Sequence, residues 1–298
     1  MASGTGSANA TWARKRSSHF MPTTGQILLL ILAILLFSTG GLLSLARTWW
    51  DRETLRIAAK ACLWAGVTVS LGVLLWHVLS RPGGSWIPLE DNFEAFVWLA
   101  VLLTGFVLYV QRTRPLGGLD WFVMPIVILL LIAAGVLGKA KPQEYVGTTW
   151  YWIHLSTVLT GALAFAIAGA TGAMYLQANR RLRSKSVPHG PKLGSLERLE
   201  RITFTSVTLG FALLTIGLIT GLVVLKAHGQ TRLGDRWFAS PKVLLAFAAW
   251  VVYAIVLHAP INPSFRGRKV AILSIFGFLL MIGTLIAVNF VPAGGGSH

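Results

Sequence analysis

The sequence predicts an all-α membrane protein, a bundle of about eight transmembrane helices. Of its 298 residues, 54% are hydrophobic and only 12% are charged, whereas soluble domains carry roughly 25% charged residues. Apolar runs recur along the chain, and a run of about 20 residues is long enough to cross a hydrocarbon core of roughly 30 Å as a helix. The alternation typical of a membrane barrel is absent, and lipid tolerates no unpaired backbone groups, so we expect helices.

The expected elements follow one another in a single domain. Residues 1–24 are rich in Ser, Gly and Thr and lack an apolar face, so we expect a disordered tail before a membrane domain of residues 25–298. The seventh run is the shortest and needs its flanks to span at about 1.5 Å per residue. The eight predicted spans are Gln26–Leu45, Ala59–Leu79, Phe93–Val110, Trp121–Leu137, Ile153–Leu176, Phe204–Leu225, Val243–Leu257 and Val270–Phe290.

The net charge of +16 indicates a membrane orientation and not a nucleic-acid partner. The Lys and Arg residues lie in short loops between spans, and more of them fall on one side, which the positive-inside rule assigns to the cytoplasm. Both termini are then outside a bacterial-type inner (cytoplasmic) membrane. The basic residues Arg14, Lys15 and Arg16 run against this orientation. A signal peptide cleaved near Ala46 would remove them, but the first run is longer than a typical signal h-region.

Cysteine usage and motif content exclude several kinds of chemistry. The only cysteine, Cys62, lies inside a predicted span, so disulfides, C-x-x-C thiol exchange and covalent C-x-x-C-H haem attachment are excluded within this chain. Phosphate-binding loops, dinucleotide fingerprints and hydrolase motifs are absent from the sequence. We therefore do not expect a stand-alone catalyst, and any thiol chemistry belongs to partners.

Three histidines lie at the ends of predicted spans. His77 closes the second span, His154 opens the fifth and His258 closes the seventh. In the predicted topology the first two are on the outer side and His258 is on the cytoplasmic side. Imidazole is a common axial ligand of haem iron. The alternative for each histidine is an ordinary hydrogen-bonded polar residue at the membrane interface.

Two neighbouring segments allow two interpretations each. The aromatic run Trp150, Tyr151 and Trp152 can anchor a helix at the interface or offer a stacking surface. Asp91 or Asn92 can cap the third span, with Glu94 in its first turn. Alternatively, a glutamate near His77 can orient that imidazole.

The loop of residues 233–242, with the sequence LGDRWFASPK, resembles the tryptophan-rich segment W-G-x-x-W-x-W-D-P-K of the integral membrane cytochrome c assembly proteins. Gly234, Trp237, Pro241 and Lys242 match that segment, and two tryptophans and the aspartate are replaced. The resemblance extends over residues 70–298 and is closest to the CcsA, ResC and CcmC type, especially its shorter HemX-like branch. The other matching pieces are the spacing from His77 to Asn92-Phe93-Glu94, His154, Leu196–Arg201, Gly217–Gly221 and His258.

The resemblance implies that haem b is bound noncovalently near the outer face. His154 matches the first outer histidine, and His298 lies roughly where the second would follow. Trp237 would be the stacking surface. His258 matches the membrane histidine after the tryptophan-rich loop, and His77 matches another membrane site, so both would be transit ligands. His154 and His258 are the candidate ligands of haem iron.

The resemblance also implies a role in cytochrome c biogenesis, in which the protein exports haem or presents it to an assembly partner. The implied partners are CcsB-like membrane proteins, thiol-redox proteins and apocytochrome c. The alternative is a HemX-like membrane scaffold that regulates haem synthesis or assembly enzymes without stable haem binding. A solute transporter would need charged or broken-helix sites at the membrane midplane, and Lys60 near a span start is the only such residue.

Overall fold

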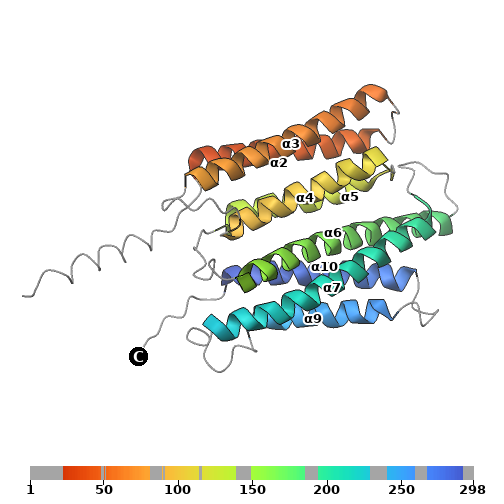
Figure 1. The fold of residues 1–298 in the computed structure, drawn as a ribbon. Coiled ribbons are helices and arrows are strands. Elements are labelled where there is room, and N and C mark those ends of the chain that lie inside the picture. Colours follow the sequence, from red (N-terminus) through yellow and green to blue (C-terminus); the bar gives the residue numbers. More distant parts are fainter. Residues whose placement is uncertain are drawn as a thin grey trace, which may run out of the picture.

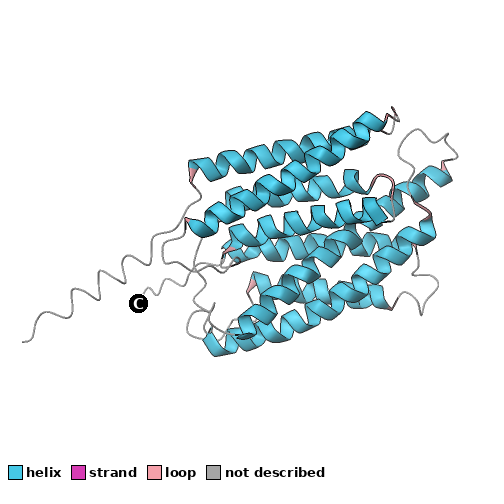
Figure 2. Cartoon of the chain, turned by 45° about the horizontal axis from the view of Figure 1, so that its top comes forward, coloured by secondary structure: helices cyan, strands magenta, loops and turns pink. Residues whose placement is uncertain are grey.

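The computed structural model describes residues 23–47, 50, 52–80, 89, 91–113, 116–138, 149–184, 194–228, 240–258 and 267–290, with backbone only for 225–228 and 288–290. These residues form helices and no strand (Figure 2), which confirms the all-α membrane bundle. The helices are α2 (Thr24–Ala46), α3 (Glu53–Leu79), α4 (Asn92–Thr113), α5 (Leu119–Leu137), α6 (Thr149–Arg183), α7 (Leu196–His228), α9 (Pro241–Leu257) and α10 (Arg268–Phe290). The tail predicted at residues 1–24 lies, up to residue 22, outside the described residues.

Every predicted span corresponds to one helix, and seven of the helices are long and apolar enough to cross a membrane. The eighth, α9, has 17 residues and reaches about 25 Å at 1.5 Å per residue. It is therefore the short span that the sequence predicts. The helices α6 and α7 have 35 and 33 residues, or about 50 Å each. Both exceed a hydrocarbon core of about 30 Å, so they extend beyond the membrane.

The helices form two groups of four that follow the chain (Figure 1). The first group packs α2 on α3 and α5, and α4 on α5, while the second packs α6 on α7 and α10, and α9 on α7 and α10. Contacts of α4 and α5 with α6 join the two groups. Successive helices run in opposite directions, as expected for neighbours joined by short connections. The helices α3, α5, α7 and α10 therefore each begin beside the end of the helix that precedes them in the chain.

This alternation collects the helix termini at two ends of the bundle. We call one the His154 end; it contains the first turns of α2, α4, α6 and α9. The opposite one, the Asp120 end, contains the first turn of α5 and the last turns of α2 and α4. There the buried carboxylate of Asp120 accepts hydrogen bonds from Ser44 Oγ and, at 3.2 Å, from Gln111 Nε2. These polar contacts hold α2, α4 and α5 together at that end.

An aromatic pair forms the centre of the second helix group. The rings of Phe165 and Tyr253 are stacked with centroids 3.7 Å apart and planes 6° from parallel, and both side chains are fully buried. Glycines make room for them: a Cβ added at Gly210 would lie 2.6 Å from Phe165, and one at Gly277 would lie 2.7 Å from Tyr253. Small residues at these positions thus allow close helix packing.

A buried threonine pair links α6 to α7, and its loss should be only mildly destabilising. Thr171 Oγ1 and Thr203 Oγ1 are 2.8 Å apart. Each hydroxyl also donates, or can donate, to its own helix. Interhelical hydrogen bonds in membranes contribute about 0.6 kcal/mol on average. We expect a double-mutant cycle of Thr171→Val and Thr203→Val to give a coupling energy of about that size. The free energy of unfolding of each variant would be measured in mixed micelles. A coupling above roughly 2 kcal/mol would contradict this estimate.

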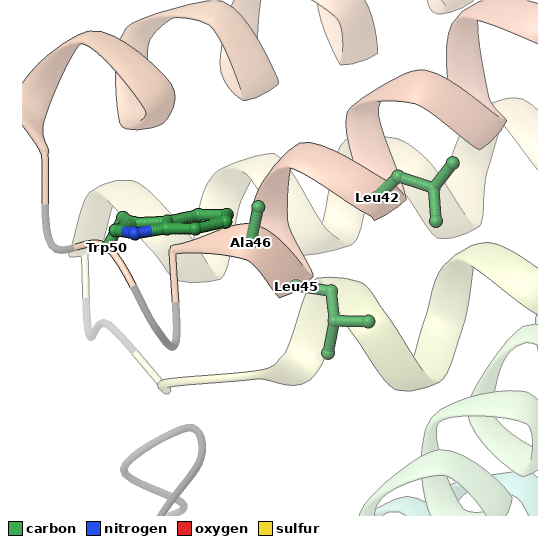
Figure 3. Close-up of a pocket in the computed structure, with 4 residues that line it drawn as sticks. All are labelled: Leu42, Leu45, Ala46 and Trp50. Atoms are coloured by element: carbon green, nitrogen blue, oxygen red, sulfur yellow. The ribbon is translucent and has the colours of Figure 1, made fainter.

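Many of the exposed side chains of α2 and α3 are large and apolar, as expected for contact with lipid. Figure 3 shows a shallow pocket near the end of α2 that is lined by Leu42, Leu45, Ala46 and Trp50. Leu42 is 60% exposed and Trp50 is 62% exposed. The lining carries no ionisable side chain. We therefore expect lipid acyl chains to fill this pocket.

Candidate functional site

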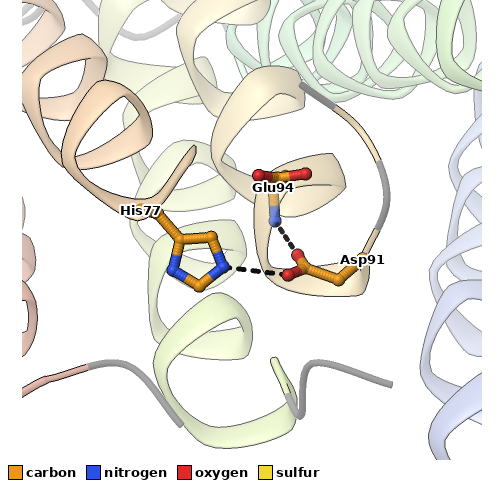
Figure 4. A group of neighbouring side chains, drawn as sticks. All are labelled: His77, Asp91 and Glu94. Atoms are coloured by element: carbon orange, nitrogen blue, oxygen red, sulfur yellow. Dashed lines mark hydrogen bonds and ion pairs between the residues drawn. The ribbon is translucent and has the colours of Figure 1, made fainter. Parts of the chain in front are cut away.

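A buried cluster around His77 lies at the His154 end of the bundle (Figure 4). His77 is in the last turn of α3, and its side chain is fully buried. Its Nε2 is 2.9 Å from Asp91 Oδ2, and its Nδ1 is 3.4 Å from Oε1 of Gln26 in the first turn of α2. The ring of Phe93 packs against the imidazole with centroids 4.7 Å apart. Three helices thus converge on one histidine.

The two carboxylates of this cluster are held by the start of α4. Asp91 Oδ1 accepts a hydrogen bond from the Glu94 backbone N–H at 2.9 Å, so the predicted helix cap is confirmed. Glu94 Oε2 accepts from the Leu89 backbone N–H at 2.7 Å. The carboxylate that lies at hydrogen-bond distance from His77 Nε2 is that of Asp91, whereas the sequence analysis considered a glutamate. One ligating atom from each of His77, Asp91 and Glu94 lies within 4.8 Å of the others.

Leu89 adopts an uncommon backbone conformation beside this cluster. Its φ of 123° is positive, which is unusual for a residue with a branched side chain. Its N–H is bound to Glu94, and its carbonyl oxygen accepts a hydrogen bond from Tyr151 Oη at 3.3 Å. These two bonds hold the backbone in place. Tyr151 is buried, whereas Trp150 is 49% exposed, as an interfacial anchor would be.

His154 occupies a second, separate position at the same end. It lies in the second turn of α6 and is half-buried. Its Nδ1 is 2.8 Å from the carbonyl oxygen of Gly217 in α7. A carbonyl can only accept, so Nδ1 carries the proton and donates it. In the neutral ring Nε2 then has a free lone pair, and no hydrogen-bond partner of Nε2 lies among the described residues.

The imidazole of His154 packs against two glycines of α7, and we call this contact surface its seat. Gly217 and Gly221 are one helical turn apart. A Cβ added at Gly221 would lie 2.9 Å from His154 Cε1 and 3.1 Å from Nδ1. At Gly217 an added Cβ would lie 3.2 Å from the Val158 side chain. Besides allowing close approach of α6 and α7, these two glycines place a histidine ring.

A cation lies near this seat. Lys242 is exposed in the first turn of α9, and its charge acts electrostatically on His154. It is one of the residues that match the tryptophan-rich segment. The rest of that segment up to Ala239, with Trp237, lies outside the described residues, as does His298. Their predicted roles stay predictions.

His258 is at the opposite end from His154. It follows the last residue of α9, is exposed, and donates from Nδ1 to the Ala254 carbonyl oxygen at 2.7 Å. Lys242 and His258 are at the two ends of α9, which is about 25 Å long. A single iron therefore cannot bind both His154 and His258. A transit role for His258 on the other membrane side stays a prediction, as does that of His77, whose two ring nitrogens both face protein oxygens.

The fold and this geometry define a class of protein: a multi-pass membrane helix bundle that presents a seated imidazole and a buried histidine–carboxylate cluster at one end. The sequence model described as "Cytochrome C assembly protein" matches residues 65–294. The chain therefore belongs to the cytochrome c assembly protein family.

Individual relatives carry the same family name. The chain is 24% identical over 284 residues to the cytochrome c biogenesis protein CcsA of one strain of Prochlorococcus marinus, with 85% of this chain and 88% of the relative covered. It is 24% identical over 306 residues to CcsA of Porphyra purpurea, with 87% and 94% covered. It is 29% identical over 233 residues to CcsA of a second Prochlorococcus marinus strain (MIT 9215), with 70% and 74% covered. No solved structure matches the chain.

Proposed function

We propose that this cytochrome c biogenesis protein binds haem noncovalently at its His154 end and exports it or presents it to an assembly partner. The observation that carries this proposal is the seat of His154 on α7. Metal-bound histidines commonly donate their other ring N–H to a carbonyl or carboxylate, which fixes the tautomer and the ring orientation. The 2.8 Å contact from Nδ1 to Gly217 matches that arrangement and leaves Nε2 for iron.

The surroundings of His154 also suit haem. Haem propionates are anionic, and a lysine ammonium is a flexible point charge that can pair with them. Lys242 supplies such a charge close to the imidazole. We propose Trp237 as a stacking surface and His298 as a second axial ligand on the same side. His258 would be a transit ligand at the opposite end, and the bound cofactor would be haem b.

The charge distribution supports an orientation for this site. The ends of α6 and α7 that extend from the membrane at the Asp120 side carry Arg180, Arg181, Arg183, Arg198 and Arg201. The positive-inside rule would place that side in the cytoplasm. The His154 end and both termini would then be outside a bacterial-type cytoplasmic membrane.

The proposal also implies partners. Cys62 lies within α3 and is the only cysteine of the chain, so reduced thiols for haem attachment would have to come from other proteins. We propose CcsB-like membrane proteins, thiol-redox proteins and apocytochrome c as those partners. The protein itself would transfer haem and would not form the thioether bonds.

The test is the absorption spectrum of the detergent-purified protein, oxidised and then reduced with dithionite, before and after addition of hemin. We expect a Soret band and sharp α and β bands on reduction, because histidine-ligated haem gives these features. The haem should leave the protein in acidified acetone, since no thiol holds it. A colourless protein that also takes up no hemin would overturn the proposal and leave the regulatory scaffold as the better account.

A further inference from the structure

We propose that His77, Asp91 and Glu94 form a binding site for a divalent first-row metal ion, with Zn²⁺ as the best fit. This site is separate from His154 and does not depend on haem binding. Its three side chains come from the end of α3 and the start of α4, and none is more than 6% exposed. Figure 4 shows the imidazole and the Asp91 carboxylate directed toward each other.

The distances suit ligands of one ion. Zinc binds imidazole nitrogen and carboxylate oxygen at about 2.0–2.2 Å, so two such ligands at angles between 90° and tetrahedral lie about 3.0–3.4 Å apart. The His77 Nε2 and Asp91 Oδ2 atoms are 2.9 Å apart, and one ligating atom from each of His77, Asp91 and Glu94 lies within 4.8 Å of the others. A small closing movement of the Glu94 side chain would complete a set of three ligands.

Both nitrogens of the His77 ring face oxygen atoms that accept hydrogen bonds. Gln26 Oε1 is on the Nδ1 side, and Asp91 Oδ2 is on the Nε2 side. A metal ion would take the place of the proton between Nε2 and Asp91, while Nδ1–H donates to Gln26. That is the usual arrangement of a metal-bound histidine with its outer hydrogen-bond acceptor.

The Gln26 side chain adjoins this cluster on the Nδ1 side of His77. It is fully buried, its Oε1 faces His77 Nδ1, and its Nε2 atom has no hydrogen-bond partner among the described residues. Its Oε1 also accepts a hydrogen bond from the Thr23 backbone N–H at 3.0 Å, which holds that oxygen where it can accept from Nδ1–H and leaves the His77 Nε2 facing Asp91.

The composition of the site selects among metals. Mixed imidazole and carboxylate ligands suit Zn²⁺, Fe²⁺ and Mn²⁺, whereas Mg²⁺ and Ca²⁺ prefer oxygen ligands alone. Because Leu89 binds both Glu94 and Tyr151, a metal here would brace the start of α4 and, through Tyr151, the start of α6.

The test uses the full-length protein in detergent, stripped of metal with a chelator, incubated with Zn²⁺ and desalted. We expect wild type to retain one Zn²⁺ per chain by mass spectrometry of the metal. The variants His77→Asn and Glu94→Gln should lose at least nine-tenths of it. His258→Asn is the matched control, because it removes an exposed imidazole at the other end of the bundle, and it should retain the metal.

A second measurement on the wild type guards against variants that fail to fold. X-ray absorption fine structure at the zinc edge should show one imidazole and otherwise oxygen ligands. Two or more imidazoles per zinc, retention that is unchanged in both variants, or no retention by wild type would each overturn the proposal. Hemin uptake by Glu94→Gln should equal that of wild type, so failure of this site and failure of haem binding are distinguishable.

Discussion

The variant His154→Ala is expected to lose the Soret band that we predict for the wild-type protein, while its fold remains intact. The imidazole is half-buried on the surface of α6, so its removal leaves no large cavity. Loss of an outer hydrogen-bond partner of a metal ligand alone weakens binding about 10–100-fold. Loss of the ligand itself should weaken hemin binding more than about 100-fold, which a titration followed by absorption would measure.

Chemical rescue distinguishes a ligand from a structural residue. His154→Gly should regain a histidine-like Soret spectrum when free imidazole is added, because the small molecule can occupy the vacated seat. His258→Ala serves as the comparison and should keep the spectrum of the outer site, since His258 lies at the opposite end of α9. Unchanged hemin affinity in both His154 variants would contradict the assignment.

The variant Gly221→Val should weaken haem binding about 10–100-fold, the effect of disturbing a ligand's supporting contacts, although it removes no polar group. Even a Cβ at this position would lie 2.9 Å from His154 Cε1. The larger side chain must push the ring off α7 and break its bond to the Gly217 carbonyl. Hemin titration and the position of the Soret band would both report the displacement.

The control is another glycine at the interface between α6 and α7. A Cβ added at Gly161 would have its nearest contact at 3.5 Å, an ordinary van der Waals distance. Gly161→Ala should therefore bind hemin like wild type. If Gly221→Val kept full affinity and an unshifted spectrum, the proposed seat of His154 would be wrong.

The first two turns of α6 connect the two clusters at the His154 end. Tyr151 reaches the Leu89 carbonyl, beside Asp91 and Glu94, and His154 reaches the Gly217 carbonyl. The two side chains are three positions apart on one helix. The two clusters therefore share one helix, and each is held there by its own hydrogen bond.

The sequence alone was sufficient to predict the eight helices, the order in which they cross the membrane and the family. Span length is a local property, because an apolar run either does or does not match the thickness of the bilayer. The cap at Asp91 is equally local, since it joins residues three apart. Helix ends outside the lipid were harder to predict from hydropathy. The helix α6 ends at Arg183, seven residues beyond the predicted span end at Leu176, because residues with high helix propensity continue after the apolar run stops.

The contacts of the histidines were decided only by the tertiary structure. Gln26 lies 51 residues from His77, and Gly217 lies 63 residues from His154. Pairings of this kind depend on how far each helix is rotated and shifted along its neighbour, and those quantities are set by side-chain packing across the whole bundle. Sequence spacing places a histidine at a helix end, but the packed helices determine whether its ring meets a carboxylate, a carbonyl or solvent.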